Sequence, residues 1–433
     1  MITLNNEQQV ASDFVVKTIL ETDKRGCTIL GEGGTGKTTS IMHAVARLQQ
    51  AGLNVLLTAP TNKATNQLKA SADNYGVVAN QCTLAKALGL ALLPDRENKK
   101  AHKLGKGCIE EGSVIVADEG SMISSTALYD YLIPALEETS SKVIFMGDKF
   151  QLPPVKEFYS PALGIFESVE LTKVERQQGD SPILKLCREL RTSMINKTSF
   201  KCESVGVDTV KAAFFTDFII EQFSSPEDTK GKRALAWTNA RVEDINMLVR
   251  KKLYGRNVPP FVVGERVSTG SPVIDNSVIL MPTDIECVVT HVSDSNVEYS
   301  YNGVTEYWRC NMVGLLPDDN FYPTTIVNVP HESESSRFNE KLSSLAERAK
   351  KSPPREAYKL WKEYHHFKDF FQTLKHCYAI TVHRSQGSTY EQAFVDVIDL
   401  LRCKQQTMRQ QLAYVACSRP KTKLVLNRSR FEL

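Results

Sequence analysis

The sequence contains no apolar run of the roughly 18–20 residues that a helix needs to span a bilayer. Its N-terminal residues also lack the basic start and apolar stretch of a secretory signal. The ten cysteines are scattered, without a C-x-x-C pair or a cluster with histidine, which argues against disulfides and structural zinc. We therefore expect an intracellular, cytoplasmic protein without a membrane partner, located in the host cytoplasm if its source is viral.

A strong excess of one charge is also missing. The 433 residues include 53 lysines and arginines and 50 aspartates and glutamates, which gives a net charge of +3. This balance excludes nucleic-acid binding through bulk charge, so any such surface must be a local groove. The composition is that of a globular protein, and the length allows about two to four domains.

The most informative segment is residues 31–38, which read GEGGTGKT and fit the phosphate-binding pattern G-x-x-x-x-G-K-[ST]. Glycines at such positions let backbone N–H groups approach phosphates without a Cβ clash. Lys37 suits the β- and γ-phosphates, and the Thr38 hydroxyl suits Mg²⁺. A β-prone run at 27–30 and a helical stretch at 39–50 flank the loop. This context favours nucleotide binding over a simple glycine-rich turn.

Strand and helix signals alternate in two regions of the chain. In the first, apolar strands are predicted at 54–58, 113–117 and 142–146, which is typical of a parallel sheet covered on both faces. A second alternating region begins near residue 171. Its predicted strands lie at 233–238, 376–382, 393–397 and 424–426.

The second region is interrupted from about 261 to 371. Short alternating strands, notably 286–292 and 297–301, suggest a small β-barrel. Residues 335–372 predict two helices separated at two adjacent prolines. An aromatic stripe on the later helix, which includes Tyr358 and Trp361, favours core or interdomain packing over base stacking. The basic segment 95–107 is either a solvated loop or a small insertion that touches nucleic acid.

Two acids follow directly after the predicted strand 113–117. Carboxylates at the C-terminal end of a buried strand occupy the position where doubly wound sheets place their chemistry. Asp118 is suited to Mg²⁺ through its water shell, and Glu119 to orienting or deprotonating an attacking water. Gln151 follows the predicted strand 142–146 in a proline-bounded loop, where its amide can sense a γ-phosphate.

The order of these and further motifs resembles a superfamily 1 helicase of the B type, in the RecD-like group that includes the Dda helicases of tailed phages. Beyond those described above, the segments that carry this resemblance are 4–11, 58–64, 82–88, 171–177, 379–388 and 411–419. Together the motifs cover nearly the whole chain. Three departures from the family pattern concern loop geometry and remove no charge needed for hydrolysis: Glu32, Gly120 and the Cys-Ser-Arg-Pro run at 417–420.

The resemblance implies an α/β fold with two RecA-like doubly wound parallel-sheet domains. Residues 1–172 would form the first, with a pin-like β-hairpin insertion at 88–112. Residues 173–260 and 374–433 would form the second. Residues 261–373 would form an inserted SH3-like β-barrel with a helical hairpin.

The resemblance also assigns roles to individual residues. The catalytic group is Lys37, Glu119, Gln151 and two arginine fingers, Arg176 and Arg419. The ATP-binding group is Gln8, Gly33, Gly34, Thr35, Gly36, Lys37, Thr38, Thr39 and Gly387, with Thr38 and Asp118 for Mg²⁺. The DNA-binding group is Pro60, Thr61, Lys63, Thr83, Trp237, Thr238, Asn239, Thr381 and His383. For Trp237 a core position is an equal alternative to base stacking, and His383 has a structural alternative.

The function implied is an ATP-dependent DNA helicase that moves 5′→3′ on single-stranded DNA and opens a fork duplex, with the 95–107 segment as a wedge. It would work as a monomer, with single-strand-binding, replication or recombination proteins as possible partners. One alternative is a RecD-like translocase subunit of a nuclease or recombination complex that does not separate strands alone. A non-catalytic ATP-gated clamp is disfavoured because all the charged catalytic groups are present.

Overall fold

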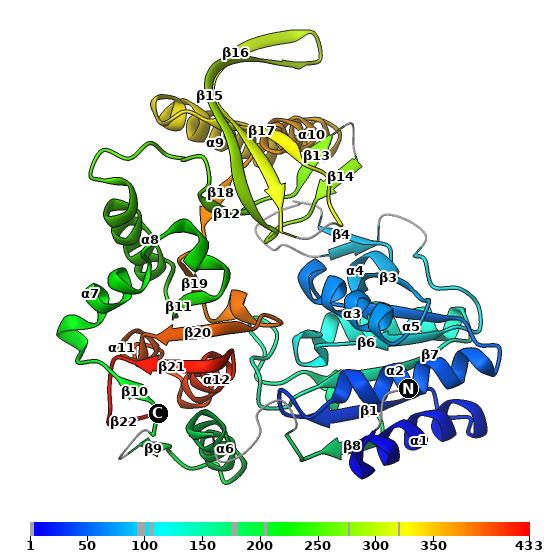
Figure 1. Cartoon of the computed structure of the whole chain (residues 1–433). Helices are drawn as coiled ribbons and strands as arrows, with labels where there is room; N and C mark the ends of the chain where they lie inside the picture. Colours follow the sequence, from blue (N-terminus) through cyan, green and yellow to red (C-terminus); the bar gives the residue numbers. More distant parts are fainter. Residues whose placement is uncertain are drawn as a thin grey trace.

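The computed structural model describes residues 4–92, 101–103, 107–174, 181–202, 206–275, 278–318 and 321–433. Two parallel sheets lie side by side, and a third, antiparallel sheet lies above them in the view of Figure 1. Among the described residues, no helix combines the length and the apolar character needed to cross a bilayer.

The first sheet has the strand order β3-β2-β6-β7-β1-β8, and all its pairs are parallel. Its strands are β1 (Gly26–Gly31), β2 (Val55–Ala59), β3 (Asn80–Thr83), β6 (Val114–Ala117), β7 (Lys142–Gly147) and β8 (Ser168–Leu171). Its helices are α1 (Asn6–Glu21), α2 (Lys37–Gln50), α3 (Asn62–Asn74), α4 (Leu84–Ala87) and α5 (Ile133–Glu138). The central strands are buried along their whole length, because apolar clusters cover both faces. The strands predicted at 54–58, 113–117 and 142–146 are confirmed as β2, β6 and β7.

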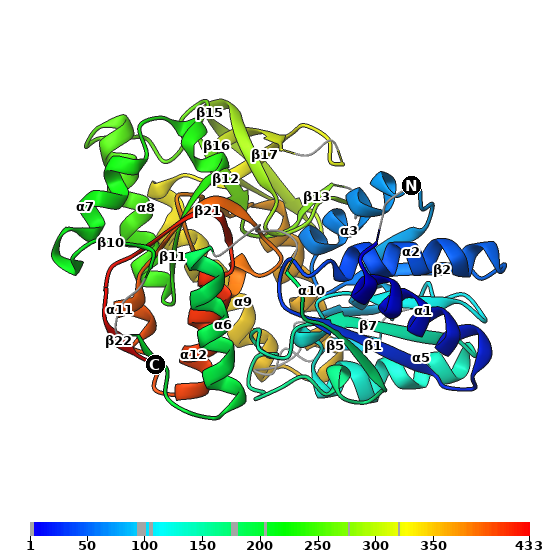
Figure 2. The same ribbon diagram turned by 60° about the horizontal axis from the view of Figure 1, so that its bottom comes forward.

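The second parallel sheet has the order β10-β21-β20-β11-β19. Its strands are β10 (Asp208–Thr209), β11 (Lys232–Ala236), β19 (Ala379–Thr381), β20 (Tyr390–Val395) and β21 (Pro420–Leu426). Its helices are α6 (Pro182–Ile195), α7 (Ala212–Gln222), α8 (Asn239–Tyr254), α11 (Val397–Leu400) and α12 (Gln406–Cys417). Helices α6 and α12 pack side by side on one face of this sheet and share its larger core (Figure 2).

The third sheet has the order β17-β16-β15-β12-β18, with antiparallel pairs throughout. Its strands are β12 (Arg266–Thr269), β15 (Glu286–Tyr301), β16 (Val304–Pro317), β17 (Thr325–Pro330) and β18 (Leu374–His376), and a separate ribbon pairs β13 (Val273–Asp275) with β14 (Val278–Met281). The prediction of separate strands at 286–292 and 297–301 is wrong. They form one strand, because β16 continues to pair across the polar residues 293–296 that resemble a turn in the sequence. The SH3-like classification stays a prediction.

Two helices, α9 (Ser335–Lys351) and α10 (Pro354–Phe370), pack against the long β15–β16 hairpin, as Figure 1 shows. Pro353 lies between them, as the sequence indicates. Trp308 is fully buried, with ring centroids 5.1 Å from Phe367 and 5.4 Å from Phe371. The predicted packing role of the aromatic stripe holds for Phe367, whereas Tyr358 is 68% exposed. Aromatic burial therefore fixes the helices on the hairpin.

Smaller elements complete the described chain. The antiparallel hairpin of β4 (Leu90–Leu92) and β5 (Ala101–Lys103) lies where the pin was predicted, and most of the basic 95–107 segment lies outside the described residues. The antiparallel pair β9 (Lys201–Cys202) and β22 (Phe431–Glu432) lies near the C-terminus. None of the ten cysteines, all of which lie among the described residues, forms a disulfide; the Sγ atoms of Cys82 and Cys108 lie 3.6 Å apart.

Candidate nucleotide and DNA site

The predicted phosphate loop connects β1 to α2, and its backbone requires glycine at two positions. Gly34 and Gly36 have φ angles of +89° and +86°, in the left-handed region that side chains disfavour. A Cβ at Gly36 would lie 2.2 Å from Nε2 of Gln8. The left-handed torsion therefore disfavours a larger residue at Gly36, the N-cap of α2, and its Cβ would also displace the Gln8 amide. A helix N-terminus that follows such a loop is a ready anion site.

Lys37 lies inside this loop as the first residue of α2. Its Nζ donates hydrogen bonds to the carbonyl oxygens of Gly31 at 2.7 Å and Glu32 at 3.0 Å. Burial lowers the pKa of Lys37, while the carboxylates of Asp148 and Asp118 act in the opposite direction. The ammonium group is therefore oriented by the loop and faces the acids across the cleft. Thr38 and Thr39 follow it in the first turn of α2, half-buried.

Gln8, predicted to contact adenine, is fixed beside the same loop. It forms a capping box with Asn5 at the start of α1: its backbone N–H donates to Asn5 Oδ1 at 2.9 Å, and Asn5 N–H donates to Gln8 Oε1 at 3.1 Å. Its Nε2 donates to the carbonyl of Thr35 at 3.3 Å. The side chain is 6% exposed. This position is compatible with the predicted role.

Asp118 and Glu119 follow the end of β6, as predicted. Glu119 has a left-handed φ of +50°, and its N–H donates to Asp118 Oδ1 at 2.8 Å. Burial raises the pKa of Asp118. Burial and then the charge of Asp118 raise the pKa of Glu119 to about 7, although Arg419 opposes the shift. A carboxyl group that titrates near neutral pH is suited to general-base chemistry.

Gln151 is 6% exposed in the loop after β7. Its Oε1 is buried and has no hydrogen-bond partner among the described residues, and the same holds for Oγ of Ser121. Both residues line a cavity of about 160 Å³. A buried amide oxygen without a partner fits a site that takes a polar ligand or water.

Two predicted residues of the second sheet lie against these groups. Gly387 has a φ of +71°, and a Cβ there would lie 4.0 Å from Glu119 Oε1. Arg419, which follows α12, is 7% exposed, and its guanidinium donates to the carbonyls of Val415 at 3.0 Å and Ser388 at 3.3 Å. The structure thus brings residues of both sheets to one cleft. Arg176 lies outside the described residues.

The donor set fits ATP and Mg²⁺. The glycine loop offers backbone N–H groups, and Lys37 offers a charge for phosphate. Thr38 and Asp118 provide hydroxyl and carboxylate oxygens, the ligand type that Mg²⁺ prefers. The buried Gln151 oxygen adds an unused acceptor.

The predicted DNA residues of the first sheet follow β2 and β3. Pro60 and Thr61 lie between β2 and α3, and Thr83 ends β3. Both threonine hydroxyls cap a helix: Thr61 Oγ1 accepts from Ala64 N–H at 3.2 Å, and Thr83 Oγ1 accepts from Lys86 N–H at 3.3 Å. These caps fix the two loops at the C-terminal edge of the sheet.

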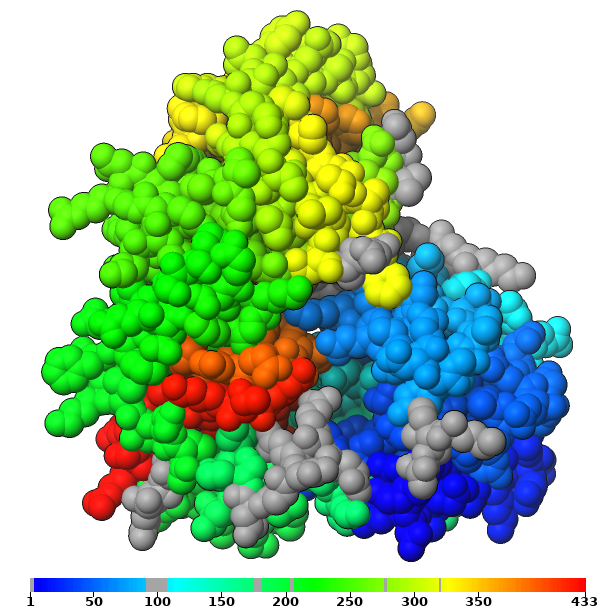
Figure 3. Space-filling view, viewed as in Figure 1, coloured from blue at the N-terminus to red at the C-terminus, as the bar shows by residue number. Residues whose placement is uncertain are grey.

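Lys63 makes a contact that sequence reasoning missed. Its Nζ donates to Oε1 of Glu286 on β15 at 3.2 Å, and Arg233 on β11 donates to Oε2 of the same carboxylate at 2.8 Å. Burial acts to raise the pKa of Glu286. The charges of Arg233 and Lys63 outweigh this effect and lower the pKa to about 2. Asn66, one turn further along α3, donates to Tyr322 Oη at 3.0 Å. Figure 3 shows the yellow segment of the third sheet meeting α3.

The predicted DNA residues of the second sheet follow β11 and β19. Asp399 accepts hydrogen bonds from the N–H groups of Trp237 at 2.9 Å and Thr238 at 2.8 Å, which holds the loop after β11; Asn239 then begins α8. The Trp237 indole is half-buried: it packs against the core and also lines a cavity of about 430 Å³, so both predicted alternatives retain support.

Thr381 and His383 follow in the same way at the end of β19. The Thr381 hydroxyl accepts from Arg384 N–H at 3.4 Å. Burial lowers the pKa of His383, which favours the neutral imidazole at pH 7.

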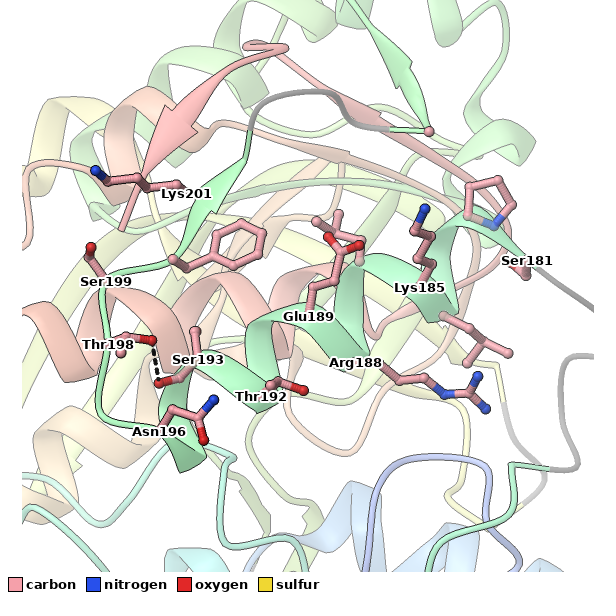
Figure 4. Close-up of a pocket in the computed structure, with 15 residues that line it drawn as sticks. Ser181, Lys185, Arg188, Glu189, Thr192, Ser193, Asn196, Thr198, Ser199 and Lys201 are labelled. Carbon is pink, nitrogen blue, oxygen red and sulfur yellow. Dashed lines mark hydrogen bonds between the residues drawn. The ribbon is translucent and has the colours of Figure 1, made fainter.

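A cavity of about 1000 Å³ lies along α6 (Figure 4). Its lining includes Lys185, Arg188, Glu189 and Asn196. None of its lining residues is a predicted nucleotide or DNA residue, and the cavity is open.

Comparison with known proteins agrees with the chemistry of this site. Residues 3–204 match the family model described as an AAA domain, and residues 376–427 match a UvrD-like helicase C-terminal domain. The chain is 26% identical to the ATP-dependent DNA helicase dda of Enterobacteria phage T4, over 96% of this chain and 97% of that protein. The predicted resemblance to superfamily 1 helicases of the Dda and RecD type is therefore confirmed.

Further relatives agree with this assignment. The helicase is 29% identical to the ATP-dependent RecD2 DNA helicase of Deinococcus radiodurans, over 37% of this chain and 21% of that protein. Its structure is similar to the Pif1 helicase from Candida albicans, with a TM-score of 0.53, 19% identity, and coverage of 99% of this chain and 95% of that one. A second Pif1 structure, solved to explain DNA unwinding at forked double-stranded DNA, has the same TM-score at 18% identity. The match covers 99% of this chain and 93% of that one. The two Pif1 likenesses confirm the predicted fold of two RecA-like domains.

Proposed function

We propose that this helicase couples ATP hydrolysis to movement on single-stranded DNA and to unwinding of duplex DNA. The observation that carries the proposal is the single cleft in which the Lys37 loop and Glu119 of the first sheet meet Gly387 and Arg419 of the second. A site divided between two sheets lets the state of the nucleotide set the distance between them. The relative in phage T4 is an ATP-dependent DNA helicase, which supports this function.

The residues of the cleft would divide the chemistry as follows. Lys37 and the loop N–H groups hold the β- and γ-phosphates, and Glu119 accepts a proton from or orients the attacking water. Thr38 and Asp118 would hold Mg²⁺, which when bound neutralises charge on the phosphate oxygens. Arg419 supplies charge to the transferring phosphoryl group, as a planar guanidinium that stays protonated. Phosphoryl transfer depends mostly on such positioning and charge.

For DNA, we propose that the strand lies along the C-terminal edges of both sheets, contacting the loops that follow β2, β3, β11 and β19. Movement would be 5′→3′, with the β4–β5 hairpin as the pin that separates base pairs. The domain limits of the sequence analysis remain part of this proposal, as do monomeric action and single-strand-binding, replication or recombination partners. A Pif1 helicase with a similar fold has been solved bound to single-stranded DNA, which supports the proposal that this fold binds a single strand.

The test is ATP hydrolysis with and without single-stranded DNA, followed by strand displacement on a forked duplex. Wild-type protein should hydrolyse ATP faster with DNA and should separate the strands. Lys37→Ala should remove both activities and retain the fold, as measured by circular dichroism. DNA-stimulated hydrolysis without strand separation would instead favour the translocase subunit of a larger complex. Hydrolysis that DNA does not stimulate would contradict the proposal.

A further inference from the structure

Asp148 is a third acid in the cleft and has no role in the reaction outlined above. It follows the end of β7, one strand over from Asp118, and is 1% exposed. Its carboxylate accepts from the N–H of Phe150 at 3.1 Å. Its other partners are the Tyr414 hydroxyl at 2.5 Å and Arg191 Nη1 at 3.3 Å. A buried carboxylate with this set of donors is held in place by charge-assisted hydrogen bonds.

The two side-chain donors come from the other half of the molecule. Tyr414 lies on α12 and Arg191 on α6, the helix pair that packs on the second sheet (Figure 2). Arg191 also donates to Glu170 on β8 at 2.5 Å, and its guanidinium lies 4.7 Å from the centre of the Phe150 ring. Asp148 therefore joins the loop after β7 to two helices of the second RecA-like domain.

Helix α12 makes a second contact with the same loop. Gln411, three residues before Tyr414, donates from Nε2 to the carbonyl of Gln151 at 3.2 Å. Residues three apart share one face of a helix, so one face of α12 meets the loop from Asp148 to Gln151. Arg419 follows shortly after the end of α12. The helix that binds Asp148 thus connects two groups proposed to act on the γ-phosphate, Gln151 and Arg419.

We propose that Tyr414 and Arg191 are positioning residues for ATP hydrolysis, which act by binding Asp148 and so fix α12 relative to the phosphate loop. This inference rests on the proposed function. Neither residue reaches the phosphates in this role; both determine where Gln151 and Arg419 lie when the cleft closes. Burial, and then the charge of Asp148, raise the pKa of Tyr414, so its hydroxyl stays a proton donor.

The first test is Tyr414→Phe, which keeps the ring and its packing and removes only the hydroxyl. Steady-state hydrolysis with saturating single-stranded DNA should show kcat lowered about tenfold and the KM for ATP changed less than about twofold, because the phosphate loop is untouched. Tyr358→Phe, at an exposed tyrosine on α10, is the matched control and should keep wild-type values. A wild-type kcat in Tyr414→Phe would overturn the proposal, as would a raised KM with kcat unchanged.

A double-mutant cycle separates positioning from general stability. If Tyr414 acts through Asp148, then adding Tyr414→Phe to Asp148→Asn should lower kcat less than twofold further, whereas independent effects would multiply.

A second pair of variants tests Arg191 and replaces the first test if Tyr414→Phe does not fold. Arg191→Lys keeps the charge and should retain more activity than Arg191→Ala. Lys185→Ala is the control on the same helix, where Lys185 lines the open cavity of Figure 4. Multiplicative losses would overturn the inference. Absence of DNA-stimulated hydrolysis in wild type would instead refute the proposed function.

Discussion

The raised pKa of Glu119 predicts a specific pH dependence for ATP hydrolysis. Burial and the charge of Asp118 raise this pKa to about 7, and the proposed general base works only when deprotonated. With a pKa near 7, about 9% of the carboxyl groups are ionised at pH 6 and about 91% at pH 8. We therefore expect kcat/KM for ATP to rise about tenfold from pH 6 to pH 8 and then to level off, because kcat/KM reports the free enzyme.

The assay is DNA-stimulated hydrolysis between pH 6 and pH 9 at constant ionic strength. Glu119→Gln provides the control, because it cannot titrate at this position and should lower kcat by about 10²–10⁴-fold. ATP itself changes its protonation state in this pH range. The affinity of Glu119→Gln for ATP is therefore measured at each pH, and its pH dependence is divided out of the wild-type kcat/KM profile. A wild-type profile that stays flat after this correction would refute the reasoning. DNA-stimulated hydrolysis that survives in Glu119→Gln would show that the base is a different group.

The same shift affects stability with a definite sign. The folded-state pKa of Glu119 lies above its ordinary value of 4.5, so between these values the folded protein binds more protons than the unfolded chain. The free energy of unfolding contributed by this group is therefore present below pH 4.5 and is lost as pH rises through about 7. Thermal unfolding should therefore be measured for Glu119→Gln and wild type at pH 5 and at pH 8. The stability of the variant minus that of wild type should be larger at pH 8 than at pH 5. The opposite sign would contradict a buried Glu119.

Three further predictions concern other parts of the molecule. Gly36→Ala should abolish ATP binding in a fluorescent-nucleotide titration, because its Cβ would meet the Gln8 amide and its φ is left-handed; wild-type affinity would contradict the loop geometry. Lys63→Ala should weaken single-stranded DNA binding and reduce the slope of log K against log salt by about 0.7, provided Lys63 exchanges Glu286 for a phosphate; an unchanged slope would leave Lys63 a structural ion pair. Trp308→Ala should cost about 3–5 kcal/mol of unfolding free energy in urea melts, since the indole is fully buried; a smaller loss would mean that the β15–β16 hairpin repacks.

Much of the nucleotide site could be predicted from the sequence because its chemistry is local. The loop at 31–38 is one continuous segment, and its glycines are required by backbone torsions within that segment. Asp118 and Glu119 are predicted by a similar local rule: acids that directly follow a buried strand lie where doubly wound sheets place their chemistry. Asp148 obeys this rule too, after β7, and could have been found in the same way.

Other parts could not be predicted because their determinants are distant in sequence. Tyr414 reads as one more apolar position of α12, and nothing near it indicates a carboxylate 266 positions away. The Lys63–Glu286 contact likewise joins two sheets. The single strand β15 was divided in two by its polar middle, since its continuity depends on pairing with β16. Local pattern therefore identifies loops and strands, whereas contacts between domains depend on packing.

The central claim is that ATP hydrolysis drives this chain 5′→3′ along one strand and through a duplex. The most direct measurement is ATP-driven strand displacement on two otherwise identical duplexes, one with only a 5′ single-stranded tail and one with only a 3′ tail. The account predicts unwinding of the 5′-tailed duplex alone, and no unwinding of either by Lys37→Ala. Unwinding of the 3′-tailed duplex alone would contradict it.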